Sequence, residues 1–400
     1  MPEIAEVARV VHFLRLRLVG KKIKDASAID DANVFGKVGT TGAAVEAALK
    51  GKKVVSAGSQ GKYFWITLEK PPHLVMHFGM TGWVHIKGAK TAYTNYYKKL
   101  KETDLAQWPP KFWKFHLTTD GEPATEVAFT DARRFGRVRL VDCPGADIRK
   151  YSPLKENGPD PVIDAERFTE DYLRDKMKAR HVPIKALLLD QAMISGIGNW
   201  VADETLYQAK LHPEQYSDTF SGVEIQRLYE AIRYVCQTAV DKLGNSDEFP
   251  PHWLFDHRWG KGGKGAASQL PNGEKISFIT VGGRTSCFAP GVQKKTGQVV
   301  LEASAVSVKA GQKRSDEDNE DDKDEDVDEK KGVTAKRRRN RKMEVKGADL
   351  DESLTKKRRT SRVKQDRGLE PELEPELKPE PSPEADITLG RRRSTRLRKY

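Results

Sequence analysis

Cysteine is scarce in this sequence, and its scarcity excludes two kinds of structural support. The 400 residues include three cysteines, Cys143, Cys236 and Cys287. They stand far apart, which argues against a disulfide framework and indicates a reducing compartment. Because no two of them form a Cys-x-x-Cys pair, a cysteine-rich zinc site is not expected either.

Long hydrophobic runs are also missing. No apolar run reaches the roughly 18 residues that a membrane-spanning helix needs, and no signal peptide opens the chain. Acidic residues are outnumbered, since 58 Asp and Glu stand against 70 Lys and Arg, a net charge of +12. This excess favours polyanionic partners, with nucleic acid first and an anionic membrane surface second.

What the sequence does have is an unusual beginning, Met1-Pro2-Glu3-Ile4-Ala5-Glu6. Removal of the initiator Met before proline would leave Pro2 as a secondary amine with an ordinary pKa of roughly 8, partly nucleophilic at neutral pH. Its attack on C1′ of a nucleoside sugar would give an iminium cation that can expel the base and drive β-elimination of the 3′ phosphate. Glu3 and Glu6 would supply carboxylates for proton transfer. A proline-initiated helix with acids at its positive end explains the same residues without chemistry.

An amphipathic helix is predicted to present this amine. Apolar residues recur at helical spacing at Ile4, Val7, Val11, Leu14 and Leu18. That stripe must pack on a core. We expect Pro2 at the first helical position and Gly20 as the C-cap.

Short β-patterned runs separated by glycines follow, up to Val141. They cover residues 52–57, 63–68, 74–78, 82–86, 112–118, 126–129 and 138–141. So many short strands predict a β-sandwich or barrel over residues 1–141, with the N-terminal helix laid against it.

Three features of this part are candidate DNA contacts. Lys62 opens a strand after a glycine-flanked turn, where it could reach a phosphate, although strand-end lysines are commonly just solvated. Met80 stands at a loop tip, where an apolar side chain is more often tucked into a core. Arg133 and Phe135 belong to Asp-Ala-Arg-Arg-Phe-Gly at residues 131–136, and an aromatic residue between basic ones in a turn is costly to expose without a partner. Such side chains can wedge into a base stack when a nucleotide is pulled out.

Residues 142–161, rich in proline, predict an interdomain linker. Helical patterns follow over residues 162–248, with helices expected near 168–177, 183–189 and 222–243. Between the last two lies Ser195-Gly196-Ile197-Gly198-Asn199. Asn199 is a suitable N-cap, and a helix N-terminus behind a glycine turn is an anion site for a DNA phosphate. A capped turn without any ligand explains this stretch equally well.

The last folded part is expected at residues 249–301. An aromatic loop is followed by two β-patterned runs, 276–281 and 285–289, that flank Gly282-Gly283-Arg284. This predicts a β-hairpin whose turn projects Arg284. Residues 302–400 alternate acidic and basic blocks and are expected to be disordered, because they cannot bury enough apolar surface. The basic clusters at 336–342, 356–359 and 391–399 resemble nuclear-import signals.

Taken together and in this order, these motifs resemble the formamidopyrimidine-DNA glycosylase/endonuclease VIII family, and most closely its plant and fungal branch. The resemblance covers roughly the first 300 residues. It implies an α+β protein with an N-terminal β-sandwich, a helical domain with a helix–two-turn–helix, and a β-hairpin finger. It also implies removal of oxidised bases from double-stranded DNA held between the domains, with β,δ-elimination at the abasic site.

The family's functional residues can be placed on this sequence. Pro2 would be the Schiff-base nucleophile, Glu3 the proton donor to the opening sugar, and Glu6 a supporting carboxylate. Lys62 would serve both chemistry and phosphate binding. The remaining phosphate-gripping positions are matched by Asn199 and Arg284, and the positions that fill the void left by a flipped nucleotide by Met80, Arg133 and Phe135.

Departures from the family pattern matter as well. Ala5 and Ala8 stand where many members have Pro and Glu, and the finger lacks its four zinc cysteines. We therefore expect a zincless finger, no metal and no cofactor. We also expect a monomer in the nucleus with no membrane partner, and a tail that binds import receptors or other proteins. The alternative is a catalytically silent protein of the same fold that only binds damaged DNA.

Overall fold

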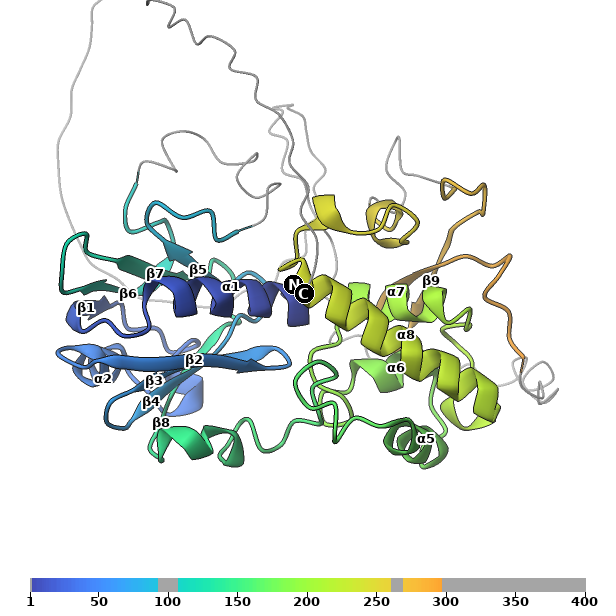
Figure 1. The fold of residues 1–400 in the computed structure, drawn as a ribbon, viewed down its shortest axis with the longest axis horizontal. Helices are drawn as coiled ribbons and strands as arrows, with labels where there is room; N and C mark the ends of the chain where they lie inside the picture. The colour runs from blue at the N-terminus through green and yellow to red at the C-terminus, as the bar shows by residue number, and fades with distance from the viewer. Residues whose placement is uncertain (1, 93–106, 260–268, 297–400) are drawn as a thin grey trace, which may run out of the picture. The chain divides into compact units, whose positions relative to one another are not determined.

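A computed structural model describes residues 2–92, 107–259 and 269–296. All of these fall within one compact unit, Met1–Lys313. The predicted tail and part of the aromatic loop lie outside the described residues. The expected α+β architecture is confirmed, with a β-sandwich followed by a helical domain and a hairpin (Figure 1).

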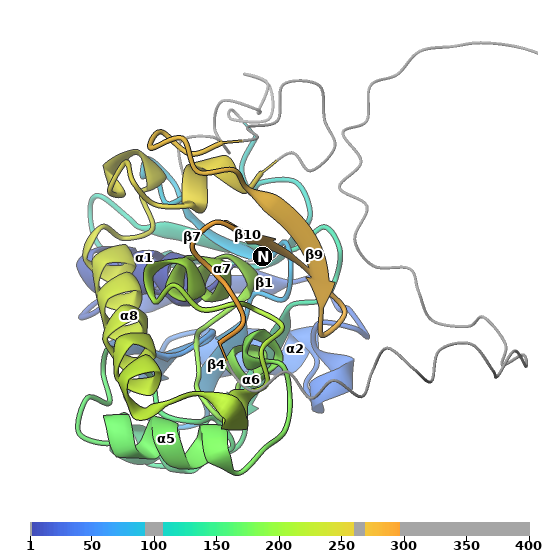
Figure 2. The ribbon, with the colours of Figure 1, turned by 90° about the vertical axis from the view of Figure 1, so that its right-hand side faces the viewer.

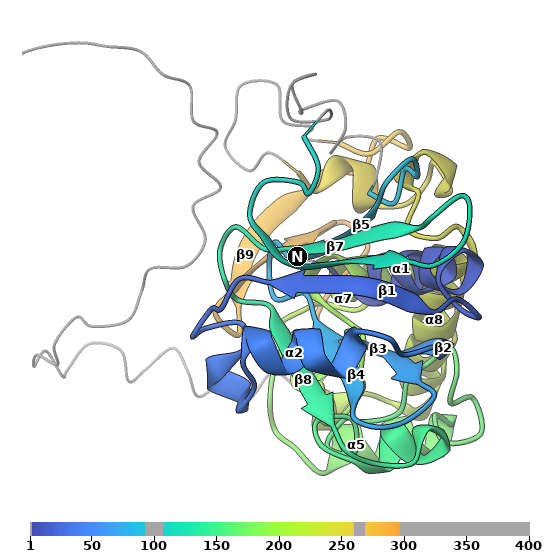
Figure 3. The ribbon, with the colours of Figure 1, turned by 90° about the vertical axis from the view of Figure 1, so that its left-hand side faces the viewer.

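Two four-stranded antiparallel sheets form the sandwich. One has the order β1-β6-β7-β5 and the other β2-β3-β4-β8, and Figure 3 shows them one above the other. The strands are β1 Ile23–Ala28, β2 Val54–Gln60, β3 Tyr63–Leu68, β4 His73–His77, β5 Trp83–Ile86, β6 Trp113–Thr119, β7 Glu126–Thr130 and β8 Arg137–Val141. Side chains from both sheets meet in one buried cluster, which is the main core of the sandwich.

Two elements of this domain were not predicted. Strand β1 is an edge strand with exposed polar residues, and the short helix α2, Gly42–Leu49, contacts it. Strand β1 lacks a regular apolar alternation, since two adjacent residues in it are exposed. Helix α2 is almost uniformly small and apolar, so no face of it stands out in the sequence.

Helix α1, Ile4–Arg17, belongs to both domains. Its first residues, Ile4 and Ala5, are buried in the core of the helical domain. The sandwich core receives Val7, Val10, Val11, Leu14 and Leu18. The expected helix limits were wrong at both ends. Glu3 is the N-cap with extended backbone, which leaves Pro2 before the helix, and Leu18 is the C-cap, while Gly20 turns the chain beyond it at φ +87°.

The helical domain packs four helices around one apolar cluster, with a hairpin beside them (Figure 2). The helices are α5 Glu170–Lys178, α6 Ile184–Leu189, α7 Asn199–Gln208 and α8 Gly222–Asp241. The hairpin is formed by β9 Ser277–Val281 and β10 Arg284–Phe288, and short 3-10 turns connect these elements. Strand β10 lies against α7, which brings the hairpin to the start of that helix.

Candidate functional site

The carboxylate of Glu3 fastens the N-terminus of the chain to helix α7. Its Oε2 accepts the backbone N–H groups of Gly198 and Val201 at 2.8 and 3.1 Å, and its Oε1 accepts that of Trp200 at 3.0 Å. These are the otherwise unpaired N–H groups of the first turn, where the helix dipole favours negative charge. Pro2, the preceding residue, is buried and is thereby fixed where the two domains meet.

Asn199 was expected to cap helix α7, and this expectation was wrong. The N-cap is Gly198, and Asn199 is the first helical residue. The capping role passes to the distant Glu3 because Gly198 has no side chain. A Cβ there would lie 2.2 Å from the Glu3 carboxyl carbon. The anion that this helix terminus holds is therefore a side chain of the protein itself.

Glu6 supplies a second carboxylate next to Glu3. Its Oε2 accepts the backbone N–H of Glu3 at 2.9 Å. Burial, together with the negative charge of Glu3, raises the pKa of Glu6 from 4.5 to about 7. A carboxyl group with this pKa can both donate and accept a proton at neutral pH.

The turn that carries Lys62 packs against the loop that precedes α7. Gly61 has φ +59°, and a Cβ on it would lie 2.5 Å from the Cβ of Ser195. Its N–H donates to the buried carboxylate of Asp160 at 2.7 Å. Since these contacts join the sandwich to the end of the linker and to the helical domain, they hold the neighbouring Lys62 at the junction.

Lys62 lies among the predicted catalytic charges. Burial lowers the pKa of its ammonium group, and the positive charge of Arg284 acts in the same direction. The carboxylates of Glu3 and Glu6 oppose this shift. Residues from the N-terminus, the β2–β3 turn and the hairpin therefore act on one another at a single place.

Asn199 joins the hairpin to this place. Its side-chain Nδ2 donates to the carbonyl of Thr285 at 3.0 Å. Arg284, the neighbouring residue, begins strand β10, and its backbone pairs with Val281 across the turn that Gly282 and Gly283 form. The three residues predicted to grip phosphate come from three segments and meet around the start of α7.

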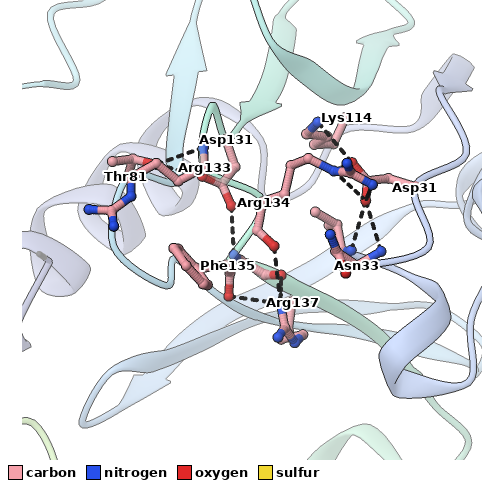
Figure 4. Close-up of polar contacts among 11 residues, drawn as sticks. Asp31, Asn33, Thr81, Lys114, Asp131, Arg133, Arg134, Phe135 and Arg137 are labelled. Atoms are coloured by element: carbon pink, nitrogen blue, oxygen red, sulfur yellow. Dashed lines mark hydrogen bonds and ion pairs between the residues drawn. The ribbon is translucent and has the colours of Figure 1, made fainter. Parts of the chain in front are cut away.

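Met80, Arg133 and Phe135 lie together in a second group, on two adjoining loops. The β7–β8 loop (residues 131–136) carries Arg133 and Phe135, and the Arg133 guanidinium lies 5.2 Å from the Phe135 ring centroid. A Cβ on Gly79, next to Met80, would lie 2.4 Å from the carbonyl carbon of Phe135. Phe135 is 42% exposed, and exposing an aromatic side chain in this turn is the unfavourable arrangement that the sequence predicts in the absence of a partner. All three residues belong to the sandwich domain, and Figure 4 shows the side chains of Arg133 and Phe135.

A buried charge cluster behind the hairpin was missed by the sequence reasoning. Asp203 on α7 accepts from Lys185 Nζ at 2.5 Å, from Arg258 Nη2 at 2.8 Å and from the backbone N–H of Cys287 at 3.2 Å. Lys185 also donates to the carbonyl of Thr285 at 3.2 Å. The side chains of Lys185 and Asp203 are 0% and 1% exposed. Because both charges have lost their water, removing any one partner would leave a buried charge uncompensated and destabilise the fold. A lone lysine in the apolar run Pro-Ile-Lys-Ala-Leu-Leu-Leu is the signal that could have revealed it.

The next residue of α7, Glu204, holds the aromatic loop. Its Oε2 accepts the backbone N–H of Phe255 at 2.9 Å, and burial raises its pKa to about 7. Helix α7 is thus bonded to the N-terminus, the hairpin and the aromatic loop.

Two further properties concern the described residues only. Across residues 2–92, 107–259 and 269–296, no group of three or more His, Cys, Asp or Glu side chains is arranged to hold a metal ion. In that same part of the chain, every helix is too short or too polar to cross a membrane.

Known proteins share both the sequence pattern and the fold of this chain. A family profile described as formamidopyrimidine-DNA glycosylase N-terminal domain matches residues 1–138, and one described as formamidopyrimidine-DNA glycosylase H2TH domain matches residues 157–249. Formamidopyrimidine-DNA glycosylase of Arabidopsis thaliana is 38% identical over 319 residues, which cover 80% of this chain and 77% of the relative. The enzyme of that name from Pelotomaculum thermopropionicum is 31% identical over 74% of this chain and 99% of its own.

Solved structures agree with these matches. Lactococcus lactis formamidopyrimidine-DNA glycosylase bound to DNA with an abasic site superposes with a TM-score of 0.58 at 26% identity, covering 73% of this chain and 100% of that one. A MutM structure in complex with DNA containing carbocyclic 8-oxo-G superposes with a TM-score of 0.59 at 26% identity, covering 74% and 100%.

Fold and site together define a DNA-binding enzyme of the helix–two-turn–helix class. The chain belongs to the formamidopyrimidine-DNA glycosylase family, and it is a DNA glycosylase of DNA repair. The family that the ordered motifs predict is thus confirmed, whereas the roles of the individual site residues stay predictions.

Proposed function

We propose that the protein is a bifunctional glycosylase and abasic-site lyase of base excision repair that removes oxidised purines through a Schiff base on Pro2. The observation that carries this proposal is the attachment of Glu3 to three N–H groups of helix α7. It fixes the adjoining Pro2 beside two carboxylates and a lysine of lowered pKa. A protein that only bound DNA would have no use for an amine held in this way.

The proposed reaction uses these groups in sequence. The Pro2 nitrogen attacks C1′, and the base departs with the electrons of the glycosidic bond and takes up the proton that the nitrogen loses. The C1′–O4′ bond then breaks, O4′ takes up a proton, and an iminium cation remains. Loss of a proton from C2′ then lets the 3′ phosphate depart, and a second elimination releases the 5′ phosphate. Glu3 assists the opening of the sugar, while Glu6, with its pKa near neutrality, exchanges protons close by.

Borohydride trapping tests the nucleophile. Wild-type protein should give a covalent adduct with duplex DNA containing 8-oxoguanine or an abasic site, and peptide mapping should place the adduct on Pro2. Pro2→Gly, or a variant that keeps Met1, should lose most of the adduct with unchanged thermal unfolding. Trapping through an internal lysine in the variant that keeps Met1 would overturn the assignment, and failure of the wild type to trap would favour the DNA-binding alternative.

The role of Glu3 is separable from that of Pro2. Glu3→Gln loses part of its attachment to α7, because the new NH2 group cannot accept a backbone N–H, so both reactions should slow. Base removal should slow further than cleavage of a preformed abasic site, because only base removal needs assistance to the leaving group. Equal losses in the two reactions would contradict this role.

Lys62, Asn199 and Arg284 are proposed to grip DNA phosphates. Lys62→Ala and Arg284→Ala should each lower the slope of log affinity against log salt by about one unit, for damaged and undamaged duplexes alike. Asn199→Ala should weaken binding without changing the slope. Lys50→Ala is a control, since Lys50 forms an exposed ion pair with Asp25. A loss confined to one lesion type would mark these residues as base readers.

The finger is proposed to work without zinc. Burial, followed by the charge of Asp203, raises the pKa of Cys287 to about 12, so this thiol is a poor metal ligand. The contacts of Asp203 with Lys185, Arg258 and the Cys287 N–H would replace the zinc as the anchor of the hairpin. Purified protein should contain no stoichiometric zinc and should cleave DNA in the presence of strong chelators. Chelator-sensitive cleavage would overturn this proposal.

We also propose that the protein acts as a monomer in the nucleus, with residues beyond 302 serving localisation and non-specific attraction to DNA. The basic clusters at 336–342, 356–359 and 391–399 support this. Truncation at residue 302 should leave single-turnover rates at low salt nearly unchanged and should cause cytoplasmic retention. A truncated protein that fails to fold or to cut would contradict the proposal.

A further inference from the structure

The side chain of Arg134, which is 47% exposed, turns away from those of its two neighbours in the β7–β8 loop. Arg133 is exposed and Phe135 is 42% exposed. The guanidinium of Arg134, between them, turns the other way, toward Asp31 in the segment that follows β1 (Figure 4). This reversal requires an unusual backbone, and Arg134 has φ +62°.

Backbone in this left-handed region is unfavourable for an arginine, because its Cβ crowds the following carbonyl. Such a conformation persists only where surrounding contacts hold it. Arg134 has these contacts, since its Nε lies 2.9 Å from Oδ2 of Asp31 and its Nη2 lies 3.1 Å from Oδ1. Two parallel bonds of this kind fix the orientation of the guanidinium as well as its distance.

Asp31 is itself held rigidly. It is 6% exposed, and it also accepts from Lys114 Nζ at 3.0 Å and from the backbone N–H groups of Asn33 and Val34 at 2.9 and 3.2 Å. Burial opposes its ionisation, but the hydrogen bonds from Arg134 and Lys114 hold the pKa of Asp31 well below its ordinary value. The partner of Arg134 is therefore a fixed, charged group in the described structure.

The other half of the loop is fastened to the loop of Met80. Asp131 is 0% exposed, accepts the N–H of Gly136 at 2.6 Å and the hydroxyl of Thr81 at 2.6 Å, and accepts the N–H of Arg133 at 3.2 Å. The ends of the β7–β8 loop are thus held by Asp131. Its middle, where the chain reverses, is held by Arg134 and Asp31.

We propose that Arg134 and Asp31 are positioning residues that hold the β7–β8 loop in its strained form, so that Arg133 and Phe135 stand ready to enter the base stack. This inference rests on the proposed wedge role of Arg133 and Phe135. Arg134 itself touches no base, and its contribution is to restrain the loop before DNA arrives. A loop already in its binding conformation loses less entropy on binding.

Arg134→Gly is the informative variant. Glycine adopts φ +62° without strain, so the backbone conformation stays accessible, while the bonds to Asp31 are lost and Asp31 keeps Lys114. Lys210→Gly is the matched control, because Lys210 is an exposed cation at φ +59° that lies on the other domain. Arg134→Lys retains the charge and should recover part of the loss.

The assay uses a duplex with 2-aminopurine beside an 8-oxoguanine, whose fluorescence rises when the stack is opened. Arg134→Gly should slow the fluorescence rise and single-turnover base removal about tenfold, a smaller loss than the roughly 100-fold that follows from misplacing a reacting group. Cleavage of a preformed abasic site in single-stranded DNA, and thermal unfolding, should match the wild type. In a Phe135→Ala background, Arg134→Gly should have a much smaller further effect, since it acts through the wedge.

The outcomes are distinguishable. If Phe135→Ala impairs opening of the stack and Arg134→Gly does not, the positioning role is wrong while the wedge stands. Equal losses on duplex and single-stranded substrates would also overturn it, since they would show an effect on chemistry or on the fold. If neither variant slows opening of the stack, the proposed wedge itself fails.

Discussion

Gly198→Ala tests the attachment of the catalytic carboxylate without altering any group that takes part in the chemistry. Gly198 has φ −118° and ψ −157°, extended backbone that alanine adopts readily. The added Cβ would lie 2.2 Å from Cδ of Glu3 and 2.4 Å from its Oε1. The substitution therefore introduces no backbone strain and acts through the displacement of Glu3, to which Pro2 is joined.

The displacement can be estimated. Carbon atoms in contact stand about 3.5 Å apart, so the carboxyl group must retreat by about 1 Å. Its bonds to the N–H groups of α7, now 2.8 to 3.1 Å, would then exceed ordinary hydrogen-bond length. Each such bond to a charged acceptor contributes about 1.5–3 kcal/mol. Water can replace part of them, so we expect a net loss of about 2–4 kcal/mol.

Two measurements check this expectation. Thermal unfolding should shift downward by about 5–10 °C, at roughly 2–4 °C per kcal/mol for a protein of this size. Single-turnover removal of 8-oxoguanine should slow about 100-fold, because Pro2 and Glu3 move together by about 1 Å. The control is Gly222→Ala, at the exposed start of α8, where a Cβ meets no atom within 4 Å. A Gly198→Ala protein that melts and cuts like the control would refute the anchoring role of Glu3.

Three other perturbations follow from the same contacts. The carboxyl group of Glu6 keeps its proton up to about pH 7 in the folded protein, whereas the unfolded chain loses it near pH 4.5. The free energy of unfolding of the wild type should therefore fall as pH rises between these values. Glu6→Gln should remove up to about 3 kcal/mol of this fall, as measured by urea unfolding. Lys185→Met leaves the buried charge of Asp203 short of a partner and should lower the free energy of unfolding by about 3–5 kcal/mol, and a wild-type midpoint would contradict the cluster. Gly79→Ala should impair duplex cleavage far more than Gly88→Ala, since both have positive φ but only the Cβ at Gly79 would strike the β7–β8 loop.

Local sequence determined the parts of this protein whose structure depends on neighbours along the chain. Strand β3 spans Tyr63–Leu68 as predicted, because a dense run of aromatic and β-branched residues after a glycine turn leaves few alternatives. The hairpin turn is formed by Gly282 and Gly283, both at positive φ, as its type requires. The ordered motifs were also sufficient for the family, which needs residue types at given positions and not their contacts.

Predictions from the sequence were wrong where a residue distant in the chain makes the contact that a local residue type favours. Asn199 has the residue type of an N-cap, yet the carboxylate of Glu3, 197 positions away from Trp200, takes the N–H groups of that helix. Helix α1 starts later than predicted for the same reason, because Glu3 adopts an extended backbone from which its side chain reaches helix α7. Local propensity is a weak preference that a buried charged contact overrides.

Only the tertiary structure decided which charges are buried and which partner each one has. Nothing in the sequence around Lys185 names Asp203 and Arg258 as its companions, and nothing around Arg134 names Asp31, 103 positions earlier. Burial removes water from Lys185, Asp203, Arg258 and Asp31, so each must be satisfied by whatever the closed chain places beside it. The residue types that this chemistry needs are therefore present in the sequence, but the contacts that orient them exist only once the two domains and the hairpin have packed around helix α7.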